Sequence, residues 1–406
     1  MKNYSLFTIL LLCLAILIVD SLAFYWLQSI TQLIELESLK TAINIILWIF
    51  TVGLITAIII LKVTLESIDP KRKHKLVSAL SGLTISSFIP KVIFVVIISL
   101  MYFSNHFFSK TESLIVVPLI GLLSGFLPFF VIMYGFFKAV YKFKVHHITI
   151  KHQKLPASFN GLKIIQISDI HLGSFNYKYH ILDKAIKVIN DSEPDFIFFT
   201  GDLVNNYAWE LIGWEKILDK LVAKKGKYAI LGNHDYGDYS EWKSKEEKKE
   251  NFDKIKIFFK NIDFKLLLNQ SEIIEQNNDK IAIIGVENWG KPPFKQYGNL
   301  QKALKKVTEI PFKILLTHDP THWSKEVIKK TNIALTLSGH THGMQLGFQY
   351  KKMKWSPSKY QYKHWAGLYT ENEKYLYVNR GLGWVGFPGR FGMRPEITLL
   401  RLQKKN

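Results

Sequence analysis

The sequence predicts a two-sheet α/β sandwich preceded by a transmembrane region of about four helices. Nearly all long apolar runs of the 406-residue chain lie before residue 143, as expected for helices that cross a bilayer. After residue 143, short apolar runs alternate with amphipathic stretches, which is the pattern of a largely parallel sheet covered by helices. We therefore expect a transmembrane region at 1–143 and an α/β domain at 144–406.

The expected membrane spans lie at about 6–28, 42–62, 78–103 and 113–137. Each is long enough to cross a hydrocarbon core of about 30 Å. No small-residue cleavage site follows the first span, so we expect it to be retained. Pro90 and Lys91 interrupt the third span, and Asp20 lies in the first. Such ionisable residues can be functional or can pair between helices, and the sequence leaves both roles open.

Lysine and arginine set the expected orientation. The loop after the second span holds Lys71, Arg72, Lys73 and Lys75, and more lysines follow the fourth span. The positive-inside rule therefore predicts a multi-pass protein of the inner (cytoplasmic) membrane, with the α/β domain in the cytoplasm. The formal net charge of +20 fits a surface beside anionic lipid better than nucleic-acid binding, because the chain is already tethered to a bilayer.

The α/β domain is expected to begin with a strand at 145–150. Further strands are expected at 163–168, 195–200, 227–231, 265–268, 272–275, 281–286, 312–317, 333–337, 375–379 and 397–402. Helices are expected at 178–190, 209–223 and 241–260.

Polar clusters directly follow the apolar runs of five of these segments. Because open α/β folds place their sites at the carboxyl ends of strands, we expect the clusters to converge. Their members are Asp169 and His171; Asp202; Asn233, His234 and Asp235; His318; and His340 and His342. Hydrolysis of a phosphate ester needs an activated water and relief of negative charge, and two cations about 3.5–4 Å apart supply both. Nitrogen and oxygen ligands without thiolate fit manganese, iron or zinc.

The ordered motifs closely resemble those of the calcineurin-like metallophosphoesterase superfamily, from residue 162 to about 402. The resemblance implies a metal-dependent phosphoric ester hydrolase with two divalent ions, most simply manganese. It implies Asp169, His171 and His342 as ligands of the first metal and Asn233, His318 and His340 as ligands of the second, with Asp202 between them. By the same resemblance, a metal-bound hydroxide would attack phosphorus, His234 would stabilise the transition state or protonate the leaving oxygen, and Asp235 would orient His234.

The C-terminal tail resembles a bacterial subgroup that is fused to membrane spans. Three of its arginines, Arg380, Arg390 and Arg394, could grip a second phosphate or form salt bridges within the protein. Met344 stands where the subgroup usually has glycine, which places a larger side chain beside the metals.

The resemblance extends to UDP-2,3-diacylglucosamine hydrolases, so the expected substrate is a lipid-linked phosphate ester or pyrophosphate at the bilayer. Alternatives are a phosphodiesterase or phosphatase for soluble nucleotides or phosphoproteins, a nuclease, and a catalytically inactive membrane scaffold. No obligate protein partner is evident in the sequence.

Overall fold

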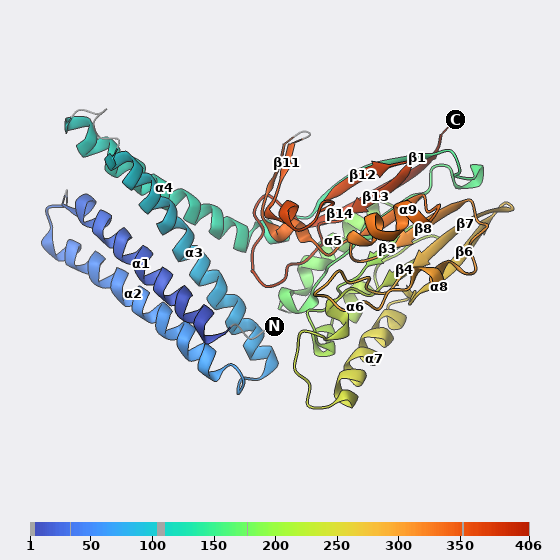
Figure 1. Cartoon of the computed structure of the whole chain (residues 1–406), viewed down its shortest axis with the longest axis horizontal. Coiled ribbons are helices and arrows are strands. Elements are labelled where there is room, and N and C mark those ends of the chain that lie inside the picture. The colour runs from blue at the N-terminus through green and yellow to red at the C-terminus, as the bar shows by residue number, and fades with distance from the viewer. Residues whose placement is uncertain (1–4, 33, 104–109, 177, 351–352, 406) are drawn as a thin grey trace. The chain divides into compact units, whose positions relative to one another are not determined.

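The computed structural model describes residues 5–32, 34–103, 110–176, 178–350 and 353–405. The chain divides into two compact units (Figure 1). The helical unit comprises residues 1–137 with 386–389, and the α/β unit comprises 138–385 with 390–406.

The helical unit contains four long apolar helices. They are α1 (Leu6–Thr31), α2 (Glu37–Thr64), α3 (Pro70–Phe103) and α4 (Lys110–Phe137). Each contains a window apolar enough to cross a membrane, so the expected four-helix transmembrane region is confirmed. The third helix runs through Pro90 without a break in its assigned helical structure.

Small and polar residues connect these helices. A Cβ added at Gly121 of α4 would lie 3.1 Å from Ile98 of α3, and one at Gly125 would lie 3.5 Å from Phe94. Two glycines four residues apart thus let the helix backbones approach closely, as in many membrane helix pairs. The buried carboxylate of Asp20 on α1 pairs with Lys91 Nζ on α3 at 2.9 Å.

Two six-stranded sheets form the α/β unit. The first has the order β1-β14-β2-β3-β4-β5, and β2, β3, β4 and β5 run parallel. Its strands are β1 (Lys144–His152), β2 (Lys163–Ile167), β3 (Phe196–Thr200), β4 (Gly226–Ile230), β5 (Lys265–Leu266) and β14 (Glu396–Lys404).

The second sheet has the order β12-β13-β9-β8-β7-β6, with antiparallel pairs only at its two edges. Its strands are β6 (Gln270–Gln276), β7 (Asp279–Gly285), β8 (Phe312–Leu316), β9 (Leu335–Ser338), β12 (Gly367–Glu371) and β13 (Lys374–Val378). A separate hairpin consists of β10 (Phe348–Tyr350) and β11 (Met353–Trp355).

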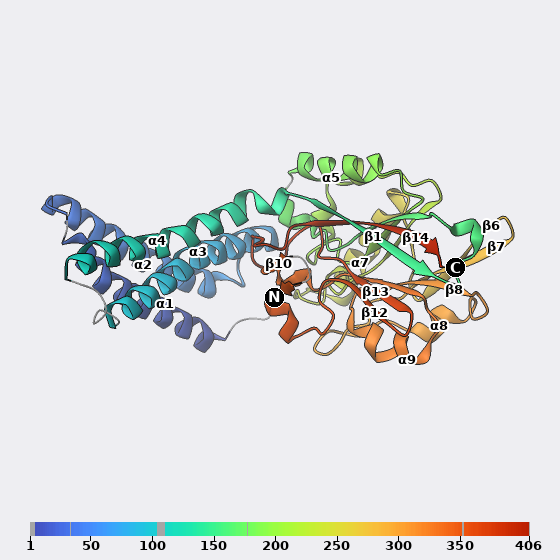
Figure 2. The ribbon, with the colours of Figure 1, turned by 90° about the horizontal axis from the view of Figure 1, so that it is seen from above.

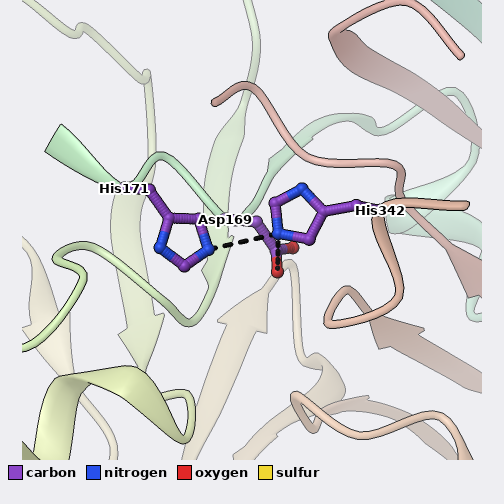
Figure 3. Close-up of side chains that lie close together, drawn as sticks. All are labelled: Asp169, His171 and His342. Carbon is purple, nitrogen blue, oxygen red and sulfur yellow. Dashed lines mark hydrogen bonds and ion pairs between the residues drawn. The ribbon is translucent and has the colours of Figure 1, made fainter. Parts of the chain in front are cut away.

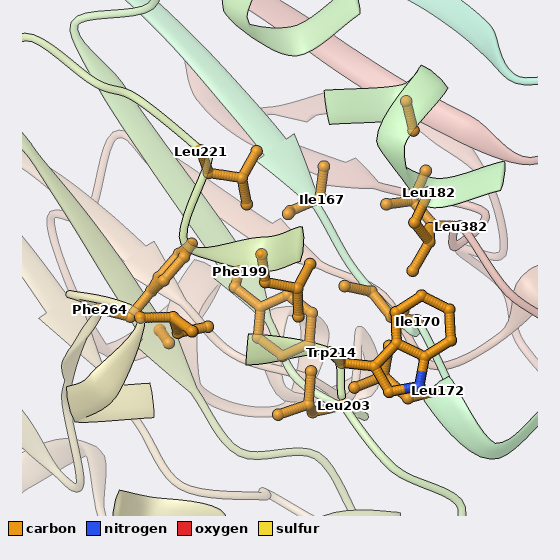
Figure 4. Packing of buried hydrophobic residues seen from close by; sticks show 14 of the residues in the cluster. Ile167, Ile170, Leu172, Leu182, Phe199, Leu203, Trp214, Leu221, Phe264 and Leu382 are labelled. Carbon is orange, nitrogen blue, oxygen red and sulfur yellow. The ribbon is translucent and has the colours of Figure 1, made fainter. Parts of the chain in front are cut away.

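Alternate side chains of the central strands point to different layers. Phe196 and Phe198 of β3 join Ile314 and Leu316 of β8 in one buried cluster, which fills the space between the sheets. Phe199 belongs to a second cluster, against the helices that cover the first sheet (Figure 4). Figure 2 shows α5 (Tyr179–Asp191) on one side of the sheets and α8 (Leu300–Leu304) with α9 (Ile328–Lys330) on the other. The predicted two-sheet α/β sandwich is therefore confirmed.

The helix expected at 209–223 is replaced by two short turns, a 3-10 turn at Ala208–Leu211 and α6 (Glu215–Leu218). Gly213 separates them with φ +81°, in the left-handed region, and a Cβ there would lie 2.2 Å from Tyr179 Oη. A glycine in this conformation ends the helical pattern that the sequence suggested. The lysine-rich helix is present as α7 (Lys245–Asn261).

Candidate metal centre

Loops at the carboxyl ends of five strands bring the predicted site residues together. Asp169 and His171 follow β2, Asp202 follows β3, and Asn233, His234 and Asp235 follow β4; from the second sheet, His318 follows β8, and His340 and His342 follow β9. The convergence requires glycine at the closest approach, because a Cβ on Gly339 would lie 2.2 Å from Asp169 Oδ2.

Backbone strain is concentrated at the same loops. Asp169, His171, Asp202, His340 and His342 all have positive φ, between 49° and 73°. Non-glycine residues in this region cost on the order of 1–3 kcal/mol each when the surrounding structure forces them into it. Such strain is typical of functional sites, and here it falls on five of the seven predicted metal ligands.

The first group consists of Asp169, His171 and His342, which are buried and offer ligand atoms within 4.8 Å of one another. Figure 3 shows the two imidazoles turned toward each other above the carboxylate. His171 Nε2 lies 3.1 Å from His342 Nε2, and His342 Nε2 lies 3.3 Å from Asp169 Oδ1. The backbone N–H of His340 donates to both oxygens of Asp169, at 3.0 and 3.1 Å, and thereby fixes the carboxylate.

The second group consists of Asp202, His318 and His340, again within 4.8 Å of one another. His318 Nδ1 donates to Thr200 O at 2.7 Å, which leaves Nε2 facing Asp202 Oδ2 at 3.2 Å. The same oxygen of Asp202 lies 3.6 Å from His171 Nε2 of the first group. The Asp202 carboxylate thus stands between the two groups.

Burial and charge act differently on the histidines. Burial lowers the pKa of His171 to about 3, and it lowers the pKa of His342 well below the usual value. Burial would also lower the pKa of His318, but the neighbouring Asp202 carboxylate outweighs it and raises the pKa to about 10. A cation that replaces the His318 proton would therefore release that proton on binding.

The donor set fits divalent metal ions. Buried neutral imidazoles such as His171 keep a lone pair, and carboxylates complete a nitrogen and oxygen set suited to manganese, iron or zinc. The side chain of Asn233 gives separate support for a bound ion. Its Nδ2 donates to Tyr239 Oη at 2.8 Å, whereas its buried Oδ1 has no hydrogen-bond partner among the residues that the structure describes. A buried amide oxygen without a partner is costly unless an ion or water meets it.

His234 lies beside the first group, with its ring centroid 5.0 Å from that of His171. The resemblance implied that Asp235 orients this ring, but in the structure the two side chains have separate hydrogen-bond partners. His234 Nδ1 faces the backbone carbonyl of Asn205 at 2.7 Å. The Asp235 carboxylate instead accepts backbone N–H groups from the loop that carries Asp202: Asp202, Leu203 and Val204, together with Gly232.

Two residues of this neighbourhood escaped the sequence reasoning. Asn205 supplies the carbonyl that faces His234. Glu210 is buried, and its carboxylate accepts the backbone N–H groups of Gly173, Asn205, Asn206 and Tyr207 at 2.7–3.1 Å. The only available signal was an acidic residue shortly after the Asp202 loop, which a surface helix would explain equally well.

The three tail arginines are engaged by the protein itself. Arg380 pairs with the buried Glu396 and donates to Gln349 Oε1 at 2.8 Å. Arg390, which is fully buried, donates to the carbonyls of Arg380, Gly381, Gly383 and Met393, and its Nη2 lies 3.2 Å from His342 Nδ1. Arg394 donates to the carbonyls of Lys142 and Phe143. These contacts favour the alternative of internal bonding over a grip on a second phosphate.

Aromatic side chains stand beside the second group. Tyr362 Oη lies 2.8 Å from His340 Nε2, so the other ring nitrogen of His340, Nδ1, faces His318 Nε2 at 3.3 Å. Phe294 packs edge-on against the His340 ring, with 5.0 Å between centroids. Neither aromatic residue was singled out by the sequence motifs.

Both units match known families. Residues 162–344 match the family model described as calcineurin-like phosphoesterase. Residues 4–140 match the model described as the transmembrane domain of a probable calcineurin-like phosphoesterase.

Relatives with names of the same kind occur in bacteria and vertebrates. The Bacillus subtilis metallophosphoesterase YkuE is 32% identical over 270 residues, which cover 64% of this chain and 85% of that protein. A metallophosphoesterase of Helicobacter pylori is 27% identical over 328 residues, covering 79% of this chain and 81% of the relative. A Danio rerio transmembrane protein with metallophosphoesterase domain is 29% identical over 67% of this chain, and the match spans only 60% of its length.

Proposed function

The chain belongs to the calcineurin-like metallophosphoesterases, a family of metal-dependent enzymes that hydrolyse phosphoesters, and from this premise we propose that its substrate is a phosphate ester carried by a membrane lipid. The observation that carries the metal-dependent chemistry is the position of Asp202 between two groups of buried ligands. The observation that favours a lipid is the presence of four apolar helices long enough to span a bilayer in the same chain.

We assign the first metal to Asp169, His171 and His342 and the second to Asn233, His318 and His340, with Asp202 shared. The short separations between opposing nitrogen atoms, 3.1 Å in the first group and 3.3 Å in the second, support this assignment, because two nitrogens that each bind one ion at about 2.0–2.1 Å lie roughly this far apart. Two divalent ions, manganese, iron or zinc, would acidify a water and neutralise charge on the phosphoryl oxygens.

His234 is the proposed proton donor to the leaving oxygen. Its Nδ1 is directed to the carbonyl of Asn205, which fixes the ring and leaves Nε2 as the nitrogen that can hold a transferable proton. Asp235 contributes indirectly, since it holds the loop that carries Asp202.

The boundary between the transmembrane region and the metallophosphoesterase domain is proposed at residues 143 and 144, with the metallophosphoesterase domain at 144–406.

We also propose that the protein resides in the inner membrane with the metallophosphoesterase domain in the cytoplasm. The basic loop that contains Lys71, Arg72 and Lys73 supports this orientation. A lipid substrate would then keep its acyl chains in the bilayer while its phosphate reaches the metal ligands. UDP-2,3-diacylglucosamine is one such compound among the lipid phosphoesters.

The test uses the purified full chain loaded with manganese. Bis-p-nitrophenyl phosphate serves as a generic soluble ester, and a panel of lipid-linked esters, including UDP-2,3-diacylglucosamine, is offered in mixed micelles. We expect hydrolysis of the generic ester and of at least one lipid ester, and loss of both with Asp202→Asn, while Asp183→Asn, on the surface beside Lys220, retains both. Hydrolysis of soluble nucleotides or phosphopeptides without any lipid ester would contradict the lipid proposal. Turnover that survives Asp202→Asn would contradict the metal site.

A further inference from the structure

The hairpin of β10 and β11 carries apolar side chains on one face and polar side chains on the other. Its register places Phe348 opposite Trp355 and Gln349 opposite Lys354. Residues directly opposite each other in an antiparallel pair point to the same face. The rings of Phe348 and Trp355 are stacked with 6.2 Å between centroids, and Met353 lies on the same face, two residues before Trp355.

The polar face is the one attached to the α/β unit. Gln349 Oε1 accepts a hydrogen bond from the buried Arg380 at 2.8 Å. Lys354 Nζ donates to Ala366 O at 2.6 Å and to Tyr369 Oη at 2.9 Å. Antiparallel sheets with one solvated face normally turn their apolar side inward and their polar side to water. This hairpin does the reverse.

The outward apolar face is correspondingly exposed. Phe348 is 49% exposed and Met353 is 66% exposed. Leu346, which leads into the hairpin, and Tyr360, which follows it, are also exposed, at 44% and 75%. We call Leu346, Phe348, Met353, Trp355 and Tyr360 the hairpin surface.

The clustering of exposed large apolar residues at the hairpin differs from their distribution over the rest of the α/β unit. Elsewhere in the described part of the α/β unit, most exposed large apolar residues stand singly on separate segments: Val188, Ile212, Val222, Ile257 and Ile273. Scattered residues of this kind are ordinary on soluble surfaces, whereas a contiguous apolar patch marks a contact with a protein, a ligand or a membrane. Met344, also exposed, lies two residues after the proposed ligand His342. The chain therefore leads from the metal centre into the hairpin within a few residues.

Charge indicates what meets the patch. The described residues 344–350 and 353–370 contain three lysines and no aspartate or glutamate. One of the three, Lys354, is bonded to the α/β unit on the polar face. Lys359 and Lys363 are exposed beside Tyr360 in the sequence. Aromatic and apolar residues flanked by lysine are the composition of segments that lie in the interface of anionic membranes, where rings enter the headgroup layer and each lysine near the surface is attracted to negative lipid.

We propose that the hairpin surface rests in the headgroup layer of an anionic bilayer and there receives the lipid whose phosphate is hydrolysed. The proposal rests on the proposed function for its substrate. A bilayer is favoured over a protein partner or a second copy because the same chain carries membrane-spanning helices and because the lysine-rich flank lacks acidic residues that a salt-bridged protein interface would use.

The test follows one fluorophore at a time in the full chain. Cys13 is the only cysteine, so a Cys13→Ala background allows single labels with a polarity-sensitive dye at Met353→Cys or Tyr360→Cys. Ile257→Cys on α7, 55% exposed, is the matched control. The proteins are reconstituted into vesicles of phosphatidylcholine and phosphatidylglycerol that contain nitroxide-labelled lipid. A melting temperature within a few degrees of that of the unlabelled parent verifies that each labelled protein is folded.

We expect the emission of the dye at residues 353 and 360 to shift to the blue when the protein is in vesicles. We also expect nitroxide lipid to quench these two dyes about twofold or more as strongly as the dye at residue 257, as for side chains at headgroup depth. Equal quenching at all three sites would overturn the proposal. A blue shift that depends on protein concentration in detergent without lipid would identify a second copy as the occupant and would overturn it as well. This readout needs no turnover, so its failure is distinct from failure of the proposed function.

A second measurement connects the surface to catalysis. Phe348→Ser combined with Met353→Ser should raise KM for a vesicle-borne phosphoester about threefold or more, because apolar area that enters the lipid is lost, and should leave hydrolysis of the soluble ester unchanged. An unchanged KM for the vesicle-borne ester would contradict a role in receiving lipid.

Discussion

Asp202 and Asp235 hold each other's loops in place. The Asp235 carboxylate accepts the backbone N–H of Asp202 at 2.9 Å, and Asp202 Oδ1 accepts the backbone N–H of His234, the residue before Asp235, at 2.9 Å. The two loops follow neighbouring parallel strands, β3 and β4. The Asp202 carboxylate is thereby positioned for the metals, because the Asp235 carboxylate fixes the Asp202 backbone.

The first prediction separates the role of Asp235 from that of His234. Asp235→Asn replaces a carboxylate oxygen with an N–H donor that faces backbone N–H groups, so we expect the free energy of unfolding to fall by about 2–4 kcal/mol and activity to fall with it. His234→Asn should lower kcat about 10²-fold or more with little change in stability. Thermal unfolding and steady-state kinetics on both variants check this. Asp235→Asn with native stability would contradict the anchoring role.

The second prediction concerns Tyr362 as a positioning residue for His340. Its hydroxyl lies 2.8 Å from His340 Nε2, which selects the ring nitrogen that faces His318. Tyr362→Phe removes this partner, and loss of such outer partners typically weakens metal binding by about 10–100-fold. Competition with a chelator measures the metal affinity. The control is Tyr360→Phe, an exposed phenol, which should bind metal as the parent does. Equal affinities for the two variants would exclude the positioning role.

Much of the arrangement of the proposed metal ligands was predictable, because these residues follow the ends of strands closely in the sequence. Asp169, Asp202 and His318 each follow a buried run that ends at a sheet edge, so their convergence follows from parallel pairing. The role of Asp235 was not predictable, since adjacency to His234 in sequence says nothing about which backbone groups a carboxylate meets after folding.

The same limit applies to other residues. Tyr362 reaches His340 from a loop that follows the hairpin, a contact without periodic signal. The hairpin itself was missed because two three-residue strands are too short to show alternation. Gly213 ended the expected helix at 209–223 through its backbone conformation, which hydrophobic periodicity does not reveal.

The third prediction concerns the acid side of the stability profile. Burial raises the pKa of Glu396, but Arg380, His146 and the hydroxyl of Tyr377 together outweigh it, so the net pKa is lowered. A carboxyl group with a lowered folded-state pKa contributes stability above its unfolded pKa, about 4.3, and loses it as pH falls through the folded value. We expect Glu396→Gln to lower the melting temperature at pH 7. Below about pH 4.3, the melting temperature of this variant should fall less steeply with pH than that of the parent.

The matched control is Glu193→Gln, an exposed carboxylate that pairs with Lys224. Exposed pairs contribute little because water screens them, so this variant should follow the parent at every pH. Melting temperatures of the full chain in detergent, from neutral to acid pH, provide the comparison. A Glu396→Gln profile parallel to that of the parent would show that this carboxylate does not titrate in the acid transition.

The last prediction addresses the ion pair within the helical unit. Asp20 is almost fully buried, accepts a hydrogen bond from Thr51 and pairs with Lys91 at 2.9 Å. Lys91→Met leaves a buried carboxylate without its cation, and we expect a loss of about 2.5–3.5 kcal/mol. The double variant Asp20→Asn/Lys91→Met removes both charges and should recover more than half of the lost stability, because the cost arises from the unpaired charge. Melting in detergent measures this coupling, with Glu37→Gln, an exposed partner of Lys40, as control. If the double variant regains stability but not turnover of a lipid ester, the pair has a functional role beyond joining α1 to α3, whereas recovery of both assigns it to helix packing alone.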